Sequence, residues 1–222
     1  MRRLASALAA GLLATAAPAA NPARIAVTPS SADAVLIVRT PATGVLYTIA
    51  IARYDPAQQD LSGDWVAFPV PPQGTGESGF GVEKVKPGTY VIKEVVQQAR
   101  WGVCFYAGTL QFDVKSGEAV YLGTLDAATP LAELRRHAVA AKDLYAGGFT
   151  VHNYFDEITP PRFQQPADPA LPEVRAFIAG EMPKTTVAPR LAQFRPATFR
   201  AGRALLGGQR VCGGSFSRKD KR

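Results

Sequence analysis

Few residues of this chain could carry catalysis. It has only two histidines and two cysteines among 222 residues, and it contains no GxSxG, HExxH or CxxC pattern. Each of those patterns brings a nucleophile, a base or metal ligands together, so their absence removes the usual signatures of hydrolases and metalloproteases. Cys104 lies in an aromatic strand pattern, and Cys212 has no histidine nearby that could activate its thiol. The sequence therefore favours a protein that is not an enzyme.

The chain contains a glycine pattern that matches a dinucleotide-binding loop by its spacing but not by its surroundings. Gly74, Gly76 and Gly79 match GxGxxG, but a dinucleotide loop needs a strand before it and a helix after it. Here Pro71-Pro72 precedes the glycines and a strand pattern follows them. We therefore expect a flexible loop and no cofactor.

Long hydrophobic runs are missing after the first twenty residues. The run from Leu4 to Ala16 has 13 residues, fewer than the roughly 20 that span a bilayer as a helix. Arg2-Arg3 precedes it and Ala17-Pro18-Ala19-Ala20 follows it, which is the pattern of a cleavable secretory signal. No cysteine follows closely enough for a lipid anchor. We predict a signal peptide over residues 1–20, no transmembrane segment in the mature chain, and a periplasmic or extracellular location.

Acidic residues are nearly absent from the C-terminal segment. Residues 184–222 contain ten basic residues and one acid, a formal charge of +9, whereas residues 21–183 carry −4. Such an asymmetry is typical of a segment that binds anions. Arginines and phenylalanines are interleaved in RLAQFRPATFR, and we predict an anion-binding surface at Arg190, Arg195, Arg200 and Arg203.

Two interpretations of this basic segment are open. Arginine with interleaved aromatic residues can hold phosphates and stack bases. Outside the cytoplasm, however, an anionic lipid, an acidic glycan or an envelope protein fits better as a partner than nucleic acid. Alternatively, the arginines form a solvated surface and the phenylalanines are buried anchors. A continuous ladder of arginines is not encoded, because Phe194 and Phe199 would face opposite sides of a strand.

The two cysteines form a pair whose meaning depends on the compartment. Behind an export signal, Cys104 and Cys212 are expected to form a disulfide. The loop would contain about 107 residues, and closing it would be worth roughly 4–5 kcal/mol by chain entropy. Such a bond would tie the C-terminal segment to the β domain. The alternative is two small buried residues that never meet.

Short apolar patterns predict about seven strands between residues 33 and 126. AVLIVR at 34–39 suits a strand buried on both faces, whereas Pro69 should keep its strand at a sheet edge. Leu110, Phe112 and Val114 share one face of the next-to-last strand. The predicted strands lie at 34–39, 45–53, 65–70, 109–114 and 119–125, with more within 82–97 around a turn at Pro87-Gly88. The pattern predicts a mainly β chain that folds as an antiparallel β-sandwich.

After residue 126 the spacing of apolar residues changes to that of helices. We expect one helix over 129–148, capped by Thr129, and a second over 170–182. Residues 184–212 fit either short strands or loop. The predicted organisation is a signal peptide at 1–20, a sandwich at 24–126, a C-terminal extension with the two short helices at 127–216, packed on the sandwich, and a disordered basic tail at 217–222.

Two stretches of the predicted sandwich resemble prealbumin-like domains. KPGTYVIKEV at 86–95 and FDVKSGEAVYLGTL at 112–125 are similar to the PGxYxLxE lines of carboxypeptidase-regulatory-like and Cna-B-type domains. The resemblance implies a prealbumin-like sandwich. In its Ala-, Arg- and Pro-rich style, the whole chain also resembles exported proteobacterial proteins.

Cna-B-type domains often form a Lys–Asn isopeptide bond beside a buried Glu, and Glu94 matches the place of that Glu. However, no lysine precedes Lys84, and the only asparagines are Asn21 and Asn153, neither on a suitable last strand. The isopeptide chemistry is therefore not supported. We expect Glu94 to be a surface or edge residue.

One cluster could support metal binding or acid–base chemistry. His152, Asp156 and Glu157 are suitable residue types, and they are the basis of an alternative hypothesis, a secreted or periplasmic hydrolase. Their spacings match neither a helical His pair nor a metal-binding loop, so an exposed loop whose aromatics Tyr154 and Phe155 dock on the sandwich is the competing interpretation. The leading hypothesis is an exported, non-enzymatic binding or structural protein without metal or cofactor.

Overall fold

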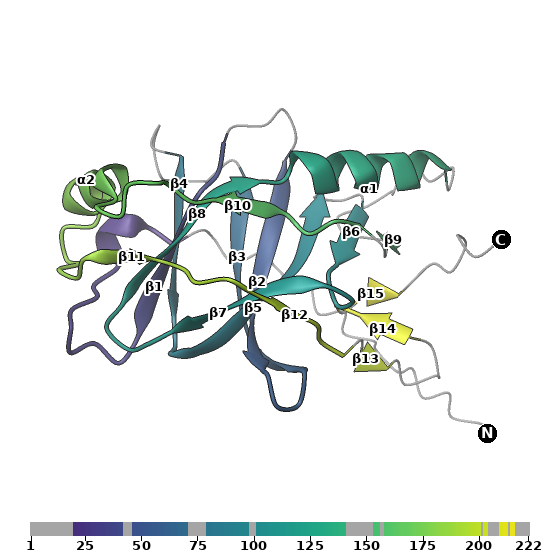
Figure 1. Cartoon of the computed structure of the whole chain (residues 1–222), viewed down its shortest axis with the longest axis horizontal. Helices are drawn as coiled ribbons and strands as arrows, with labels where there is room; N and C mark the ends of the chain where they lie inside the picture. Colours follow the sequence, from purple (N-terminus) through teal and green to yellow (C-terminus); the bar gives the residue numbers. More distant parts are fainter. Residues whose placement is uncertain are drawn as a thin grey trace, which may run out of the picture.

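The strands predicted between residues 33 and 126 form the two facing sheets of a β-sandwich (Figure 1). The computed structural model describes residues 20–41, 46–70, 79–97, 101–140, 153–155, 158–200, 202–203, 209–212 and 214–215. The predicted signal peptide, apart from Ala20, and the predicted tail at 217–222 lie outside these residues. The fold is mainly β with two α-helices in the described part of the extension, as the sequence predicts.

Sheet A is built around a strand that is buried on both faces. Residues 34–38 of β1 are buried, as the continuous apolar run predicts, because a further layer covers each face of this sheet. β1 pairs antiparallel with β4 and in parallel with β8. The members of sheet A are β1 (Ala34–Arg39), β4 (Phe80–Val85), β8 (Ala119–Asp126), β10 (Arg162–Gln164) and β11 (Pro189–Leu191).

Sheet B lies opposite and follows the order β12-β7-β5-β2-β3, with β6 on β5 and β9 on β6. Pro69 lies in β3, whose described ladder partner is β2 alone, so the predicted edge position is confirmed. The strands are β2 (Tyr47–Asp55), β3 (Asp60–Val70), β5 (Gly88–Gln97), β6 (Trp101–Cys104), β7 (Thr109–Val114), β9 (Asn153–Phe155) and β12 (Arg195–Ala197). A small third sheet holds β13 (Gly202–Arg203), β14 (Gln209–Val211) and β15 (Gly214–Ser215).

The main core fills the space between the sheets. Phe112 and Val114 are buried in it and Leu110 packs against it, so the predicted alternation of β7 is confirmed. Phe112 stacks with Tyr90 of β5 at 6.1 Å between ring centroids. Full burial of an apolar side chain of this size contributes about 1.5–3 kcal/mol. Burial of the side chains on the inward faces of these strands therefore holds the two sheets together.

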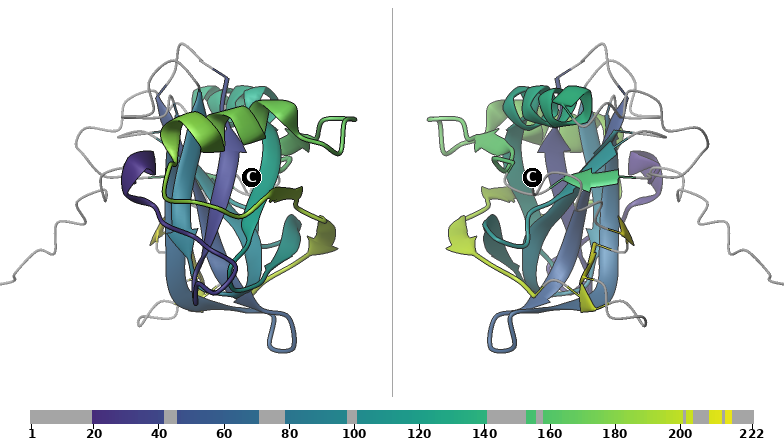
Figure 2. Two further views of the ribbon diagram at one scale, coloured as in Figure 1. Left: turned by 90° about the vertical axis from the view of Figure 1, so that its left-hand side faces the viewer. Right: turned by 90° about the vertical axis from the view of Figure 1, so that its right-hand side faces the viewer.

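A second apolar layer covers the outer face of sheet A. Helix α2 (Pro172–Glu181) lies across this face (Figure 2). Its apolar side, with Val174, Phe177 and Ile178, packs on the sheet as its spacing predicts. The ring of Phe177 stacks on that of Phe80 at 4.6 Å. The segment after the 3-10 turn η1 (Pro22–Arg24) completes this layer.

Helix α1 (Ala128–Ala140) closes one end of the main core. Leu134 and Ala138 are fully buried in that core, as the predicted apolar stripe requires. The helix begins one residue before Thr129, which was expected to cap it. The Asp126 carboxylate instead accepts a hydrogen bond from the Ala128 N–H at 3.0 Å. Residues 141–148 of the predicted helix lie outside the described residues.

The extension closes one open side of the sandwich. β10 and β11 share the same edge of β8, with β11 on Ala119–Tyr121 and β10 on Thr124–Asp126. The chain then crosses to sheet B, where β12 pairs with the edge of β7 (Figure 1). Between the two sheets Ala192 is buried in the main core, and the Phe194 ring contacts Phe112 edge-on at 5.6 Å. Phe199 is buried on the outer face of sheet B, so the two phenylalanines do face opposite sides.

A glycine makes this edge pairing possible. Gly123 has φ +110°, and a Cβ atom placed there would lie 2.8 Å from the carbonyl oxygen of Gln164, the last residue of β10. Any side chain would collide with that backbone. β10 can therefore approach β8 only because residue 123 is glycine.

Candidate functional site

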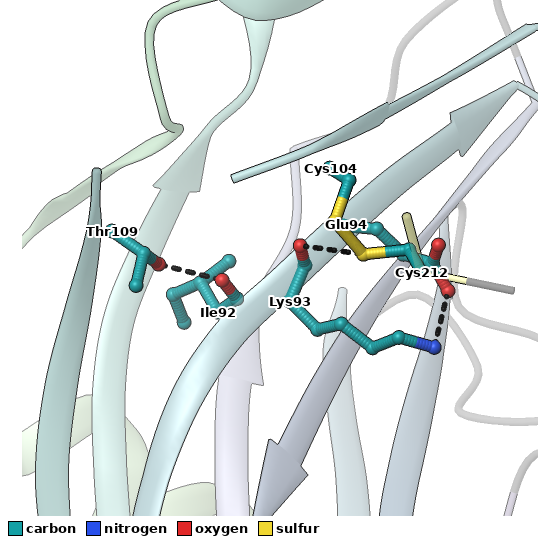
Figure 3. Close-up of a disulfide and its surroundings, with 6 residues drawn as sticks. All are labelled: Ile92, Lys93, Glu94, Cys104, Thr109 and Cys212. Atoms are coloured by element: carbon teal, nitrogen blue, oxygen red, sulfur yellow. Dashed lines mark hydrogen bonds and ion pairs between the residues drawn. A yellow bond between two sulfur atoms is a disulfide. The ribbon is translucent and has the colours of Figure 1, made fainter. Parts of the chain in front are cut away.

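The predicted disulfide joins the sandwich to the C-terminal segment (Figure 3). Cys104 ends β6, and Cys212 lies 108 residues later with its Cα atom 5.9 Å from that of Cys104. Cys104 belongs to a small apolar cluster on the outer face of sheet B, together with Val91 and Phe199. The bond therefore holds the end of the described chain against this face.

A β-bulge next to the disulfide marks the place where β5 changes partner. β5 pairs with β7 up to Val91 and with β6 from Glu94 onward. Across from them on β2, Ala50 pairs with Glu94 while the next residue, Ile51, pairs with Ile92. Lys93 is thus the extra residue of the bulge.

The carbonyl groups of Ile92 and Lys93, at the bulge, both accept hydrogen bonds. The Ile92 carbonyl accepts from the Thr109 hydroxyl at 2.6 Å, and the Lys93 carbonyl accepts from the Phe105 N–H at 3.0 Å. Cys212 Sγ lies 3.6 Å from the same Lys93 carbonyl oxygen (Figure 3). The turn between β6 and β7 and the disulfide therefore fix the bulge from two sides.

The bulge creates a buried ion pair. Lys93 Nζ is 3.0 Å from Glu94 Oε1, and the two side chains are only 15% and 9% exposed. Lys93 Nζ also lies 5.4 Å from the centroid of the Trp65 ring, which is 55% exposed. The expectation that Glu94 is a surface or edge residue is wrong, because Glu94 is 7% exposed and pairs with β2 on one side and β6 on the other.

Sequence reasoning missed this pair for a geometric reason. Neighbouring residues on a regular strand face opposite sides of a sheet, so Lys93 and Glu94 could not be expected to meet. The extra residue of the bulge brings their side-chain termini together. No local sequence pattern marks the bulge, because its position depends on where the pairing partner of β5 changes from β7 to β6.

Two of the four predicted anion-binding arginines pair with acids of the sandwich. Arg190 Nη2 is 2.5 Å from Glu118 Oε2 and donates to the Asp113 carbonyl at 2.9 Å. Arg195 Nη2 is 2.6 Å from Asp113 Oδ2. The basic extension therefore neutralises part of its charge on the acidic sandwich.

The environment of Glu118 shows which of these pairs is held more firmly. Partial burial would raise the pKa of this carboxyl, but hydrogen bonds from Arg190 and from the Lys115 N–H hold the pKa below its ordinary value. The N–H of Lys115 donates to Glu118 Oε2 at 2.8 Å. By contrast, Arg195 and Asp113 are both more than half exposed, so their pair is screened by water and salt.

A recess of about 590 Å³, here called the Arg190 recess, is formed where these charges meet. It carries three cationic side chains, two carboxylates, one amide and one aromatic ring. Its lining residues are Asp113, Lys115, Glu118, Arg190, Gln193, Phe194 and Arg195. Such a mixture can hold an anionic group that also offers hydrogen-bonding hydroxyls.

The other two predicted arginines are not part of this recess. Arg200 is exposed, and its backbone N–H donates to the Gln59 carbonyl at 2.7 Å. Arg203 belongs to β13 by its backbone, and its side chain lies outside the described residues. The structure thus brings together Arg190 and Arg195 and leaves Arg200 at another place.

A second hollow, of about 470 Å³, lies on sheet A beside the start of α2. Arg39 and Glu173 form an ion pair at its rim with 2.5 Å between Nη1 and Oε2. Tyr121 lines it, and burial raises the pKa of its hydroxyl, although a hydrogen bond with Thr124 acts in the opposite direction. The sequence carries no motif that points to this hollow.

The hydrolase hypothesis concerns residues that the structure does not describe. His152, Asp156 and Glu157 lie outside the described residues, and only the backbone of Tyr154 and Phe155 in β9 is described. Gly74 and Gly76 of the glycine pattern also lie outside them. Within the described ranges, no three His, Cys, Asp or Glu residues come together as metal ligands would.

Comparison of the chain with protein-family models, with curated proteins and with solved structures found no match. Of the helices described, none is both long and apolar enough to cross a membrane. The resemblance to prealbumin-like domains therefore stays a prediction. The function has to be argued from the disulfide, the charged recess and the sandwich that carries them.

Proposed function

We propose that this protein is exported and acts, without catalysis, as a binding or structural module in the cell envelope or outside the cell. The Cys104–Cys212 disulfide carries the proposal, because such bonds form and persist in oxidising compartments. The N-terminal signal pattern at residues 1–20 supports the same compartment. The disulfide ties the last described segments to the sandwich, which suits a protein that works in an oxidising compartment.

The Arg190 recess is the proposed binding place, and an acidic glycan is the proposed ligand class. Its three cationic side chains can pair with a carboxylate of a sugar acid, and Gln193 can bond to hydroxyl groups. Phe194 offers a half-buried ring at the same place. An anionic bilayer is a flat surface and would approach Asp113 and Glu118 as well, so a recess containing two carboxylates suits it less.

Binding to polygalacturonate, a carboxylate-rich polysaccharide, tests this assignment. We expect Arg190→Ala with Arg195→Ala to weaken binding of the oxidised protein about tenfold or more, since charge-assisted hydrogen bonds contribute roughly 1.5–3 kcal/mol each. Arg175→Ala, which removes an exposed arginine of α2, is the matched control and should change nothing. Vesicles of phosphatidylglycerol form the second arm: preferential binding to them, or equal binding by the double variant, contradicts the assignment.

Export is tested separately. The full chain expressed in a bacterial host should be recovered from the periplasm or the medium, with no free thiol under denaturing, non-reducing conditions. A protein retained in the cytoplasm with two free thiols contradicts the proposal. This result does not depend on the identity of the ligand.

A further inference from the structure

Among the residues that the structure describes, one carboxyl group beside the start of the predicted mature chain has no cationic partner. Glu83 of β4 is half-buried, and its Oε1 is 3.5 Å from the backbone nitrogen of Ala20. None of the ion pairs among the described residues includes Glu83. The charged residues on the surrounding elements pair elsewhere or are exposed: Lys84 with Asp33, Lys86 and Arg53 with Asp64, Arg39 with Glu173, and exposed Asp60 and Arg24.

The position of the Ala20 nitrogen is set by the fold. Ala20 packs against the apolar layer on the outer side of sheet A, whose members Ile25 and Val27 are buried. Between Ala20 and Ile25, the side chain of Asn21 caps the 3-10 turn η1: its Oδ1 accepts a hydrogen bond from the Ala23 N–H at 3.0 Å. These contacts are made by Ala20 and the residues after it, so none of them involves the residue before the nitrogen.

The sequence places a cleavage signal at this same nitrogen. Ala17 and Ala19 have the spacing that leader-cutting peptidases require before the scissile bond. A cut one residue later would put Pro18 where the first small residue belongs. Ala14 and Ala16 have the same spacing before the Ala16–Ala17 bond. Only a cut between Ala19 and Ala20, however, releases an amino group at the nitrogen that lies beside Glu83.

We propose that a leader-cutting peptidase hydrolyses the Ala19–Ala20 bond and that the α-ammonium group so released forms an ion pair with Glu83. The inference rests on the export proposed above. One water molecule is consumed: the C–N bond breaks, the hydroxyl goes to the Ala19 carbonyl carbon, and the Ala20 nitrogen gains protons to become NH₃⁺. Processing thereby supplies a cation that the described neighbours of Glu83 do not provide.

The consequence is a change in how stability depends on pH. With an amide nitrogen at Ala20, burial raises the pKa of Glu83 to about 7, and the hydrogen bond from Ala20 offsets this only in part. A raised pKa in the folded state means stability that is complete below the unfolded pKa of about 4.5 and is lost as pH rises through 7. An ammonium group at this distance removes that loss, because it favours the carboxylate.

Four proteins test the pair: chains that begin at Ala20 with a free or an acetylated α-amino group, each with Glu83 or Glu83→Gln. By NMR titration, we expect the pKa of Glu83 near 7 in the acetylated protein and roughly 1–3 units lower with the free amine. At pH 6.5 the free amine should raise Tm by roughly 3–6 °C with Glu83 and not with Gln. Glu181→Gln, on the nearby helix α2, is the matched control and should leave the amine effect intact.

An equal pKa of Glu83 in both forms, or an amine effect that persists in Glu83→Gln, overturns the ion pair. The N-terminal residue of the exported protein tests the cut. Ala20 supports it, whereas an exported protein that begins at any other residue overturns the inference and leaves the proposed function standing. A protein found only in the cytoplasm with its leader attached overturns the proposed function and the cut, while the four-protein measurement still decides the pair.

Discussion

The sandwich and the extension are held by different kinds of contact. β2 and β3 have nine and eleven residues and bury one face of each in a shared core. β10, β11 and β12 of the extension have three residues each, and all pair with β8 or β7 rather than with one another. The extension therefore depends on the sandwich for its structure, through edge pairing, single buried anchors, ion pairs and one disulfide.

Removal of the disulfide should have the largest effect. In the variant with Cys104→Ser and Cys212→Ser, we expect a loss of about 4–5 kcal/mol, since a loop of 108 residues is no longer closed in the unfolded chain. Urea unfolding measures it. Hydrogen exchange should show earlier opening around Phe199 than in β2 or β5, and reduced wild-type protein is the control. An unchanged unfolding midpoint after reduction would contradict the proposed dependence of the extension.

Removal of an aromatic ring should have the next largest effect, and its cost in stability should differ between the sandwich and the extension. Phe112→Ala should cost about 3–5 kcal/mol and destabilise the whole sandwich. Phe194→Ala, whose ring is only partly buried against the same core, should cost less than half of that and should loosen β11 and β12 before the sheets. Denaturant unfolding followed by tryptophan fluorescence compares the two variants. Equal costs would mean that the extension belongs to the core as much as β7 does.

A smaller effect is expected where the extension approaches β8 most closely. Gly123→Ala should cost about 1–3 kcal/mol, because φ is +110° and the new Cβ meets the Gln164 carbonyl. Gly180→Ala is the control: it lies in helix α2 with nothing within 4 Å of its Cβ position, and it should be neutral or stabilise by up to about 1 kcal/mol. Thermal unfolding of both variants, measured side by side, gives the two costs, and an equal effect of the two substitutions would contradict this explanation.

The exposed ion pair should matter least. Asp113→Asn should change the free energy of unfolding by less than about 1 kcal/mol, because Arg195 and Asp113 are both more than half exposed. The difference should vanish in about 1 M salt, where charges are screened within roughly 3 Å. A double-mutant cycle with Arg195→Ala gives the coupling energy. A coupling that survives high salt would mean that this pair is better shielded than its exposure indicates.

Sequence patterns predicted the sandwich and the two helices well and the short strands of the extension poorly, for the same physical reason. The bounds of β1 and β7 agree with the predicted 34–39 and 109–114, because a buried face imposes a period that can be recognised. Three-residue strands such as β11 have no period, and their pairing depends on an edge formed 70 residues earlier. The disulfide was predictable only because the leader pattern suggested the compartment.

The site residues divide in the same way. Arg190 and Arg195 were identified by their charge, but their acidic partners, Glu118 and Asp113, lie 72 and 82 residues away in sequence, respectively. No local pattern links them. The Lys93–Glu94 pair needs a bulge that only the exchange of β7 for β6 explains. Local sequence patterns therefore could not predict these ion pairs, because the partners become neighbours only through the topology of the sheets.

The closure of the β8 and β7 edges also sets a time order for folding. The strands that cover these edges, at residues 162–164, 189–191 and 195–197, follow β7 and β8 in the chain and are therefore made after them. Until then both sheets present unpaired backbone groups that can recruit another strand. Pairing over such sequence separations is slow. The sandwich thus cannot complete both of these edges before the chain has been made as far as residue 197.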